Sequence, residues 1–213
     1  MLAAGVVALG ASAQAAEVSS TEYALITIPV HAGNNLIGIS VNATEVSIPS
    51  VLKGINTTDS VKVWNGSAYS AAAEAQNVDV STGSSFFLMM PEGTESFNAY
   101  ELGVAPSETA PVPVTISSDM AIVAPPYANT WSLNDLTFST ASSTRYNKAN
   151  RVCVWNGTGY DYYWYLPGSG WRNKVNGGSV PSSFGAGQAV FVQLGGGASS
   201  GTVTFAAKAA AAQ

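Results

Sequence analysis

The amino-acid sequence predicts an all-β fold of two tandem homologous domains, each a β-sandwich or a small barrel-like unit, with little helix. Three observations support this prediction: a hairpin motif that occurs twice, short runs of alternating or β-branched apolar residues, and frequent turn residues between those runs. Short strands separated by turns roughly every 8–12 residues are typical of sandwiches and barrels.

The hairpin motif has the pattern Val-x-Val-Trp-Asn-Gly-x-x-Tyr and occupies residues 61–69 and again residues 152–160. The tryptophans of the two copies, Trp64 and Trp155, are 91 residues apart, a spacing of domain size. The similarity continues downstream, where Phe87 lies opposite Phe191 at a spacing of 104 residues. The larger spacing indicates extra residues in the second copy, between residues 162 and 178.

The duplication and the local composition predict how the chain is divided. We expect a signal peptide at 1–15, a β domain at 16–105, a linker at 106–113, a second β domain at 114–208 and an Ala-rich tail at 209–213. The linker carries three prolines, which favour an extended and semi-rigid segment. The first segment is apolar and ends in Ala13-Gln14-Ala15, the small-x-small pattern of a cleavage site, although no Lys or Arg precedes it.

The strands follow from the apolar runs in chain order. In the first copy we expect strands at residues 23–30, 36–41, 60–64, 84–90 and 96–102. In the second copy we expect them at residues 114–116, 120–123, 151–155, 160–165, 189–193 and 201–205. Pro29 indicates that the first strand lies at a sheet edge or ends there, because proline has no N–H to donate to a neighbouring strand. Single helical turns are predicted at 48–53 and 71–75, and Gly195 to Gly197 is predicted to be a turn.

Each motif copy predicts a hairpin that is closed by Asn-Gly in a type I′ turn, since Asn and Gly tolerate the positive φ angles of that turn. Trp and Tyr are then expected to pair across the two strands. The structural residues of the two hairpins are Trp64, Asn65, Gly66, Tyr69, Trp155, Asn156 and Gly157.

The composition argues against several classes of function. Charged residues make up 10% of the chain, against about 25% in an average globular protein. A net charge of −5 with eight basic residues does not provide the basic surface that nucleic acid requires. After the leader, no run of 18 apolar residues predicts a membrane-spanning helix.

The sequence contains no recognisable set of catalytic residues. His31 is the only histidine and has no counterpart in the second copy, so we expect it to be structural or on the surface. Glu92, Glu95 and Glu101 lie near one another in the sequence, but no carboxylate recurs in both copies, and a glycosidase needs two that face each other. We therefore expect no catalytic residue, no cofactor and no metal site.

The second copy carries an aromatic run that the first copy lacks: Tyr160, Tyr162, Tyr163, Trp164 and Tyr165, followed by Trp171. Alternation places Tyr160, Tyr162 and Trp164 on one face of a strand and Tyr163 and Tyr165 on the other. Three interpretations stay open: core packing with incidental surface tyrosines, a subunit interface, or a platform that stacks on sugar rings.

The single cysteine, Cys153, corresponds to Lys62 in the first copy, which predicts an outward-facing side chain. A chance small residue and an intermolecular disulfide are the two interpretations of this position.

These motifs resemble a family of secreted proteins from Verrucomicrobia, Planctomycetes and related bacteria. The resemblance rests on residues 28–30, 33–37, 62–69 and 83–87, and covers most of residues 22–104 and, more loosely, residues 115–206. The shared motifs are hairpin and core segments. The resemblance therefore implies secretion and β structure, and carries over no active site.

Together these features favour a secreted non-enzymatic structural protein, a subunit of an extracellular filament, surface layer or matrix. Its main partner is expected to be the protein itself, through β-edge and aromatic contacts, with the strand at 17–30 adding to a neighbour's sheet. The alternative is a carbohydrate-binding module at the cell surface, with a polysaccharide as partner. A hydrolase would need two carboxylates that face one cleft.

Overall fold

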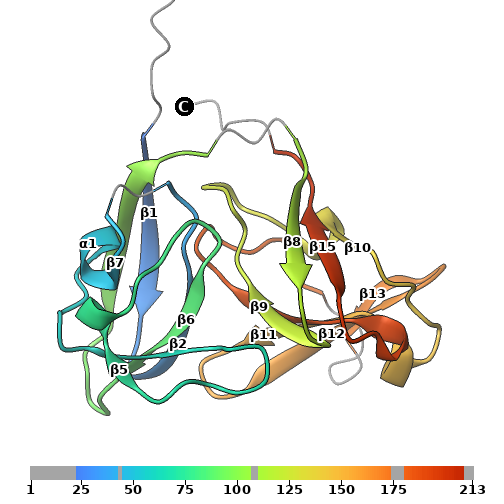
Figure 1. Ribbon diagram of the computed structural model, residues 1–213, viewed down its shortest axis with the longest axis horizontal. Coiled ribbons are helices and arrows are strands. Elements are labelled where there is room, and N and C mark those ends of the chain that lie inside the picture. The colour runs from blue at the N-terminus through green and yellow to red at the C-terminus, as the bar shows by residue number, and fades with distance from the viewer. Residues whose placement is uncertain (1–22, 43–44, 107–109, 174–179, 209–213) are drawn as a thin grey trace, which may run out of the picture.

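The computed structural model describes residues 23–42, 45–106, 110–173 and 180–208, and this part of the chain is predominantly antiparallel β structure (Figure 1). The all-β prediction is confirmed. The expected leader at 1–15 and the tail at 209–213 lie outside the described residues. No helix among those residues is long and apolar enough to cross a membrane.

Seven strands belong to the N-terminal half of the chain: β1 (Tyr23–Val30), β2 (Gly33–Gly38), β3 (Leu52–Lys53), β4 (Ser60–Val63), β5 (Ala73–Glu74), β6 (Ser85–Met90) and β7 (Phe97–Val104). The C-terminal half contains β8 (Val112–Ile116), β9 (Met120–Val123), β10 (Leu136–Phe138), β11 (Arg151–Trp155), β12 (Tyr160–Leu166), β13 (Gly170–Asn173), β14 (Val190–Gln193) and β15 (Gly201–Phe205). The helical elements are short: α1 (Ile48–Val51), η1 (Ala75–Asn77), η2 (Leu133–Asp135), η3 (Tyr146–Lys148) and η4 (Gly195–Gly197).

The two halves share one strand order. The N-terminal half has the sheets β1-β7-β3 and β2-β6-β4-β5, and the C-terminal half has β8-β15-β10 and β9-β14-β11-β12-β13. The strands β1 to β7 correspond, in chain order, to β8, β9, β10, β11, β12, β14 and β15. With this correspondence the strand orders of the two halves are the same, and β13 has no counterpart. This additional strand lies where the sequence indicated extra residues. That the halves are two separate domains stays a prediction.

Each half has its own apolar core between its two sheets. The N-terminal core includes Ile28 of β1 and Phe86 of β6, and the C-terminal core includes Val190 of β14 and Val203 of β15. Buried and exposed residues alternate along β7, as expected when one face of a strand packs on a core.

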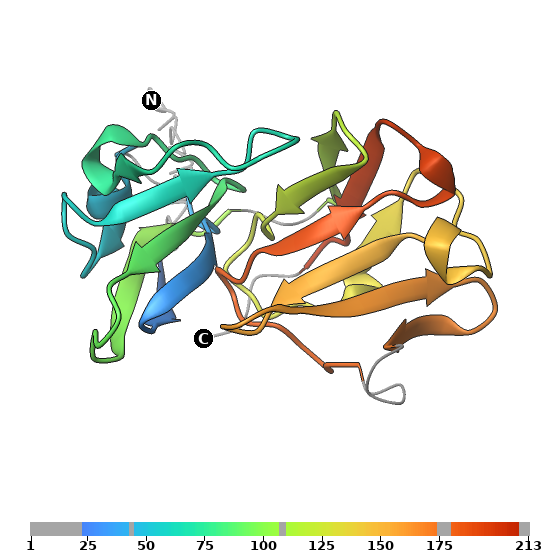
Figure 2. The same cartoon turned by 90° about the horizontal axis from the view of Figure 1, so that it is seen from below.

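A third apolar cluster joins the halves. It is formed by Phe87, Cys153 and Phe191, which lie on the sides of the two larger sheets that point away from each half's own core. The halves therefore lie side by side, with the outer faces of these sheets against each other (Figure 2).

Local expectations were met in part. Pro29 lies in an edge strand, as predicted, and α1 forms within the helical turn expected at 48–53. The turn expected at 71–75 is wrong, because Ala73 and Glu74 pair with β4 as a short strand and the helical turn begins only at Ala75. β8 begins at Val112, inside the segment expected to be linker, and its Pro113 is accommodated because β8 is also an edge strand.

Candidate functional site

The two motif copies form hairpins in which Trp and Tyr face each other, Trp64 opposite Tyr69 and Trp155 opposite Tyr160. Each pair of rings meets edge to face, with centroids 5.1 Å apart in the first hairpin and 5.0 Å in the second. The predicted cross-strand aromatic pair is confirmed in both copies.

The prediction of a type I′ turn in each hairpin is wrong. Among the described residues only glycines have positive φ, such as Gly66 at 100° and Gly157 at 98°, so neither asparagine adopts the conformation that this turn requires. The loops are longer, and the asparagine side chain closes them. Asn65 Oδ1 accepts the backbone N–H groups of Ser67 and Ala68, at 3.0 and 2.9 Å. Asn156 makes the corresponding contacts at 3.1 and 2.9 Å, as Asn does in tight loops generally.

The hairpins pack against each other. We call Trp64, Tyr69 and Phe87 the N-terminal triad. The C-terminal triad consists of the corresponding Trp155, Tyr160 and Phe191. The tryptophan of each triad meets the phenylalanine of the other edge to face, at 5.4 and 5.5 Å between centroids. The tyrosine hydroxyls of the two triads are 3.2 Å apart and share a hydrogen bond. Burial raises the pKa of both phenols, so both stay protonated at neutral pH.

Cys153 lies in this interface. Its side chain is on the outer face of its own sheet, as the comparison with Lys62 predicted, but it is not at the surface, because the N-terminal half covers it to 4% exposure. Burial raises the pKa of the thiol to about 11, although the charge of Arg151 opposes this rise. A buried thiol cannot reach a second chain, so this structure provides no geometry for an intermolecular disulfide.

The six aromatic residues singled out in the second copy do not form one flat surface. Tyr163 and Trp171 belong to the C-terminal core, and Trp164 is 9% exposed, with the ring of Tyr146 edge to face against it at 5.3 Å. Tyr165 is 40% exposed and contacts Trp171.

The other two aromatic residues connect the interface to a cleft. Tyr160 lies in the interface, and its ring is 6.5 Å from that of Tyr162. The ring of Tyr162 stacks on Trp164 at 5.9 Å. The expected alternation of the strand is thus seen, since Tyr160, Tyr162 and Trp164 follow one another on the same face.

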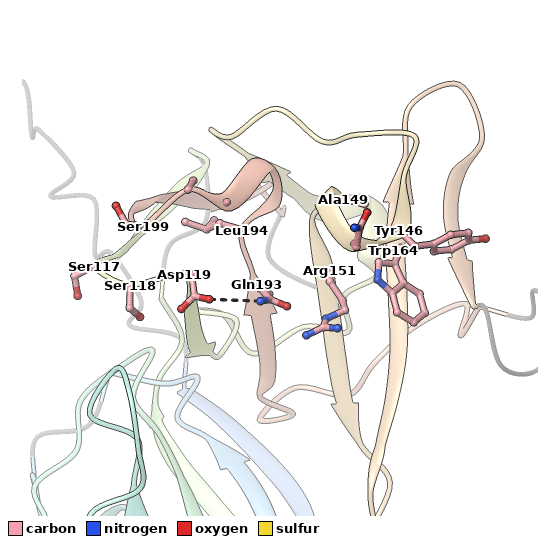
Figure 3. Close-up of a pocket in the computed structure, with 13 residues that line it drawn as sticks. Ser117, Ser118, Asp119, Tyr146, Ala149, Arg151, Trp164, Gln193, Leu194 and Ser199 are labelled. Carbon is pink, nitrogen blue, oxygen red and sulfur yellow. Dashed lines mark hydrogen bonds between the residues drawn. The ribbon is translucent and has the colours of Figure 1, made fainter.

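Beside this row lies a cleft of about 520 Å³, which we call the Arg151 cleft (Figure 3). It collects side chains from four segments: Asp119 before β9, Tyr146 of η3, Arg151 of β11 and Gln193 at the end of β14. Gln193 Nε2 donates to Asp119 Oδ2 at 3.5 Å. The cleft therefore presents amide, carboxylate, guanidinium and aromatic groups together, a combination suited to a polar ligand with some apolar surface.

Arg151 separates this cleft from a smaller cavity of about 220 Å³ at the interface, which also contains Cys153 and Tyr162 in its lining. The guanidinium lies 5.1 Å from the centre of the Tyr162 ring, a cation–π contact. Its Nε is buried and has no hydrogen-bond partner within the described part of the chain. A cavity of about 230 Å³ on the other side of the paired tyrosines is lined by Lys62, at the position that corresponds to Cys153.

The carboxylates are dispersed. Glu92 and Glu95 are exposed, whereas Glu101 is fully buried in the N-terminal core. Glu101 Oε1 accepts the backbone N–H groups of Ser40 and Val41 at 2.7 and 2.9 Å. Burial raises the pKa of this carboxyl to about 7, although these two hydrogen bonds oppose the rise.

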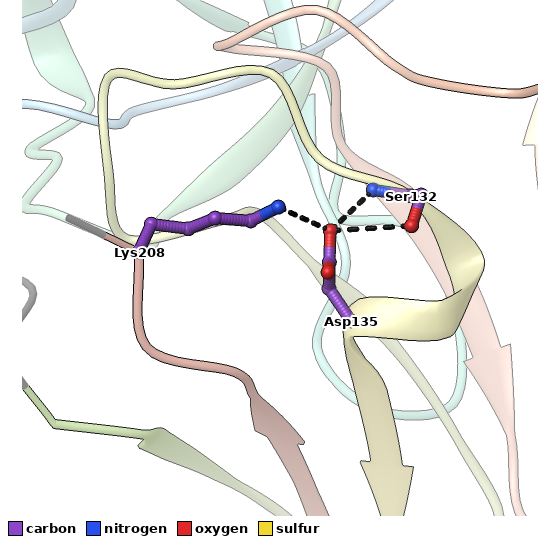
Figure 4. A network of polar contacts seen from close by, with 3 residues as sticks. All are labelled: Ser132, Asp135 and Lys208. Atoms are coloured by element: carbon purple, nitrogen blue, oxygen red, sulfur yellow. Dashed lines mark hydrogen bonds and ion pairs between the residues drawn. The ribbon is translucent and has the colours of Figure 1, made fainter. Parts of the chain in front are cut away.

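Asp135 has a structural role. Its Oδ2 accepts the backbone N–H of Ser132 at 2.7 Å and forms an ion pair with Lys208 Nζ at 2.8 Å, which ties the segment after β15 to η2 (Figure 4). His31 is exposed, as expected, and its Nδ1 lies 2.9 Å from Ser96 Oγ. Within the described ranges, no group of three or more His, Cys, Asp or Glu residues could hold a metal ion.

Sequence reasoning did not identify Tyr146, Arg151 or Gln193 as site residues, because they lie on three different elements and carry no motif. The repeat itself contained one usable signal: Arg151 stands where the first copy has Ser60, so a polar residue has become a large cation in one copy only.

No family model, curated protein or solved structure matches the chain. The resemblance to secreted bacterial β proteins therefore stays a prediction.

Proposed function

We propose that the protein is a secreted, non-enzymatic structural protein that assembles with copies of itself into an extracellular filament, surface layer or matrix. The observation that carries this proposal is an apolar patch on the outer face of β1 and β7. It consists of Tyr23, Leu25, Tyr100 and Leu102, which are 40 to 65% exposed. Leu25 and Leu102 are direct cross-strand partners, so the patch is continuous across the two strands.

The patch belongs to the N-terminal half alone. By strand register, Glu101 corresponds to Phe205. Glu101 pairs with Leu52, directly after α1, and Phe205 pairs with Leu136, directly after η2. Thr204 and Ala206 therefore stand where the N-terminal half has Tyr100 and Leu102. An exposed apolar face that is not required by the shared scaffold is typical of an interaction surface.

A second copy of the chain is the occupant that fits this surface best. β1 is the longest edge strand in the described part of the chain, and its eight residues include no charge, whereas monomeric proteins usually protect such edges with charged residues. The only charged residue of β7, Glu101, points inward. Two copies related by a two-fold axis would cover both patches at once. The open edge of β1 would then provide the further contact that an extended assembly requires.

Electron microscopy and light scattering of the purified chain test this proposal. We expect mass to increase with concentration, and Leu25→Lys to suppress the increase because it places a charge in the patch. Thr204→Lys, on the corresponding face of the C-terminal half, is the control and should assemble normally. A wild-type chain that stays monomeric at its highest soluble concentration would exclude this function.

The Arg151 cleft supports polysaccharide binding as a second candidate function, since it combines aromatic, amide and guanidinium groups. Pull-down with insoluble polysaccharides and a glycan array are the tests. Binding should be lost in Arg151→Gln and Tyr146→Ala and kept in Arg145→Gln, which changes an exposed arginine outside the lining. No binding of any glycan by the wild type would rule this candidate out.

A further inference from the structure

The interface between the halves has the organisation of a two-fold dimer interface within one chain. Most of its ring contacts occur in pairs that interchange when each residue is replaced by its repeat counterpart. The Tyr69–Phe191 contact at 6.2 Å has no such counterpart among the described residues. The Trp64–Phe191 contact at 5.4 Å corresponds to the Trp155–Phe87 contact at 5.5 Å. The Tyr–Phe contacts within the two triads, at 5.3 and 5.4 Å, correspond in the same way.

Two contacts pair a residue with its own counterpart, as contacts on a two-fold axis must. One is the hydrogen bond between the hydroxyls of Tyr69 and Tyr160. The other joins Gly38 and Ala124, which are equivalent by strand register, one residue beyond Ile37 and Val123. A Cβ built on Gly38 would overlap the Cβ of Ala124. The interface thus tolerates one methyl group at this point and not two.

The symmetry is broken in several hydrogen bonds. Gly38 N–H donates to Gly187 O at 2.8 Å, and Gly187 N–H donates to Ser40 Oγ at 3.0 Å, whereas the described part of the chain has no corresponding bond between Ala124 and Gly83. A further asymmetric bond involves the tryptophans. Trp155 Nε1 donates to the backbone oxygen of Asn34 at 2.7 Å, across the interface. The counterpart of Asn34 is Met120, whose backbone oxygen already accepts the hydroxyl of Ser118. Trp64 Nε1 is buried and has no partner among the described residues. A buried donor without an acceptor destabilises the arrangement that contains it.

From these observations we infer that the N-terminal half is a self-complementary surface, able to pair with the N-terminal half of a second copy of this chain. In such a pair Gly38 faces Gly38, so no methyl groups overlap. Each Trp64 finds the Asn34 oxygen of the other copy, so neither indole donor is left unpaired.

The C-terminal half lacks this property. Pairing two C-terminal halves brings Ala124 against Ala124, the overlap that a Cβ on Gly38 would create. It also leaves two Trp155 donors opposite Met120 oxygens, the place at which Trp64 Nε1 makes no hydrogen bond among the described residues. The pairing within one chain is intermediate. One methyl group, that of Ala124, lies at the Gly38 contact, and one indole donor, that of Trp64, has no partner among the described residues. Covalent linkage favours this internal pairing because it keeps the effective concentration of the C-terminal half high.

A matched pair of substitutions tests the inference in the full-length chain. Phe191→Ala weakens the internal interface from the C-terminal side and leaves the N-terminal surface intact. Phe87→Ala removes the equivalent contacts but damages the N-terminal surface itself. We expect Phe191→Ala to double its mass by light scattering as concentration rises, and Phe87→Ala to stay monomeric. Equal dimerisation of the two variants, dimerisation of Phe87→Ala alone, or none in either would overturn the inference.

Both variants are made in a Leu25→Lys background, so that the sheet-face patch proposed above cannot produce the dimer and the two proposals fail separately. If the alanine variants lose their near-ultraviolet circular dichroism, Phe191→Leu and Phe87→Leu replace them with the same expectation. In the Phe191→Ala dimer, adding Trp64→Phe should weaken association more than adding Trp155→Phe, because only Trp64 gains an acceptor there. An equal effect of the two would contradict the pairing.

Discussion

The two hairpins have the same sequence pattern and nearly the same ring geometry, yet their surroundings differ. The indole of the first, Trp64, lines a cavity with Cys153 and Arg151 and has no hydrogen-bond partner in the described structure. The indole of the second, Trp155, lines a cavity with Lys62 and donates to the backbone oxygen of Asn34. Residues that both copies keep build the scaffold and the contact between the halves. Residues that differ between the copies create the cleft, the apolar patch and the preference for one pairing.

The largest expected effect concerns the ring contacts that both copies share. Phe87→Ala and Phe191→Ala should each lower the free energy of unfolding by about 3–5 kcal/mol, because each removes a buried ring from the interface. The two losses should agree to within about 1 kcal/mol, since the two rings make corresponding contacts. Urea unfolding at low protein concentration measures both, and clearly unequal losses would show that the two-fold relation is only superficial.

A smaller effect concerns a buried position at which the halves differ, Glu101 in one and Phe205 in the other. The pKa of Glu101 is raised to about 7 in the folded chain, against an ordinary value of 4.5 for this carboxyl. The folded state therefore holds the proton more tightly, so the associated stability is present at low pH and is lost as pH rises through about 7. Linkage puts this loss on the order of 3 kcal/mol between pH 4.5 and 7.

Glu101→Gln should remove this pH dependence while keeping an acceptor for Ser40 and Val41. Urea titrations at several pH values between 4 and 8 compare the two proteins. A wild-type stability that stays constant or rises over this range would refute the assignment of a protonated buried carboxyl.

The two hairpins also differ in whether the indole N–H has an acceptor. Trp155→Phe should cost about 1–2 kcal/mol more than Trp64→Phe, because it removes a hydrogen bond to Asn34, whereas the other change removes a buried donor that has no described partner. The difference in urea midpoint between the two variants measures this directly. Equal losses would mean that Trp64 finds an acceptor in solution.

The smallest effect lies outside the repeat relation. Lys208→Ala removes a partly exposed ion pair with Asp135 and should lower stability by less than about 1 kcal/mol. The loss should shrink further in high salt, because salt screens exposed charges. Thermal unfolding at low and high salt measures it, and a salt-independent loss would indicate packing by the lysine stem instead.

Much of the fold could be predicted from local patterns. Alternation identified strands such as β7 and β12, Pro29 indicated an edge, and the paired Trp and Tyr followed from the hairpin motif. The turn type was wrong because Asn-Gly alone does not specify the loop length, and here the Asn side chain closes a longer loop. Two members of the aromatic run, Tyr163 and Trp171, became core residues, since alternation says which residues share a face but not what covers it.

The duplication, the all-β class and the pairing of residues within each hairpin follow from the sequence alone, because they depend on contacts between neighbours in the chain. The three-dimensional arrangement was needed to show that Cys153 is covered, that Glu101 is buried and that Arg151 lies with Asp119 and Tyr146 in one cleft. The sequence pattern of an outward-facing strand position is the same whether water or another sheet lies against it. The physical difference arises only when the two halves come together.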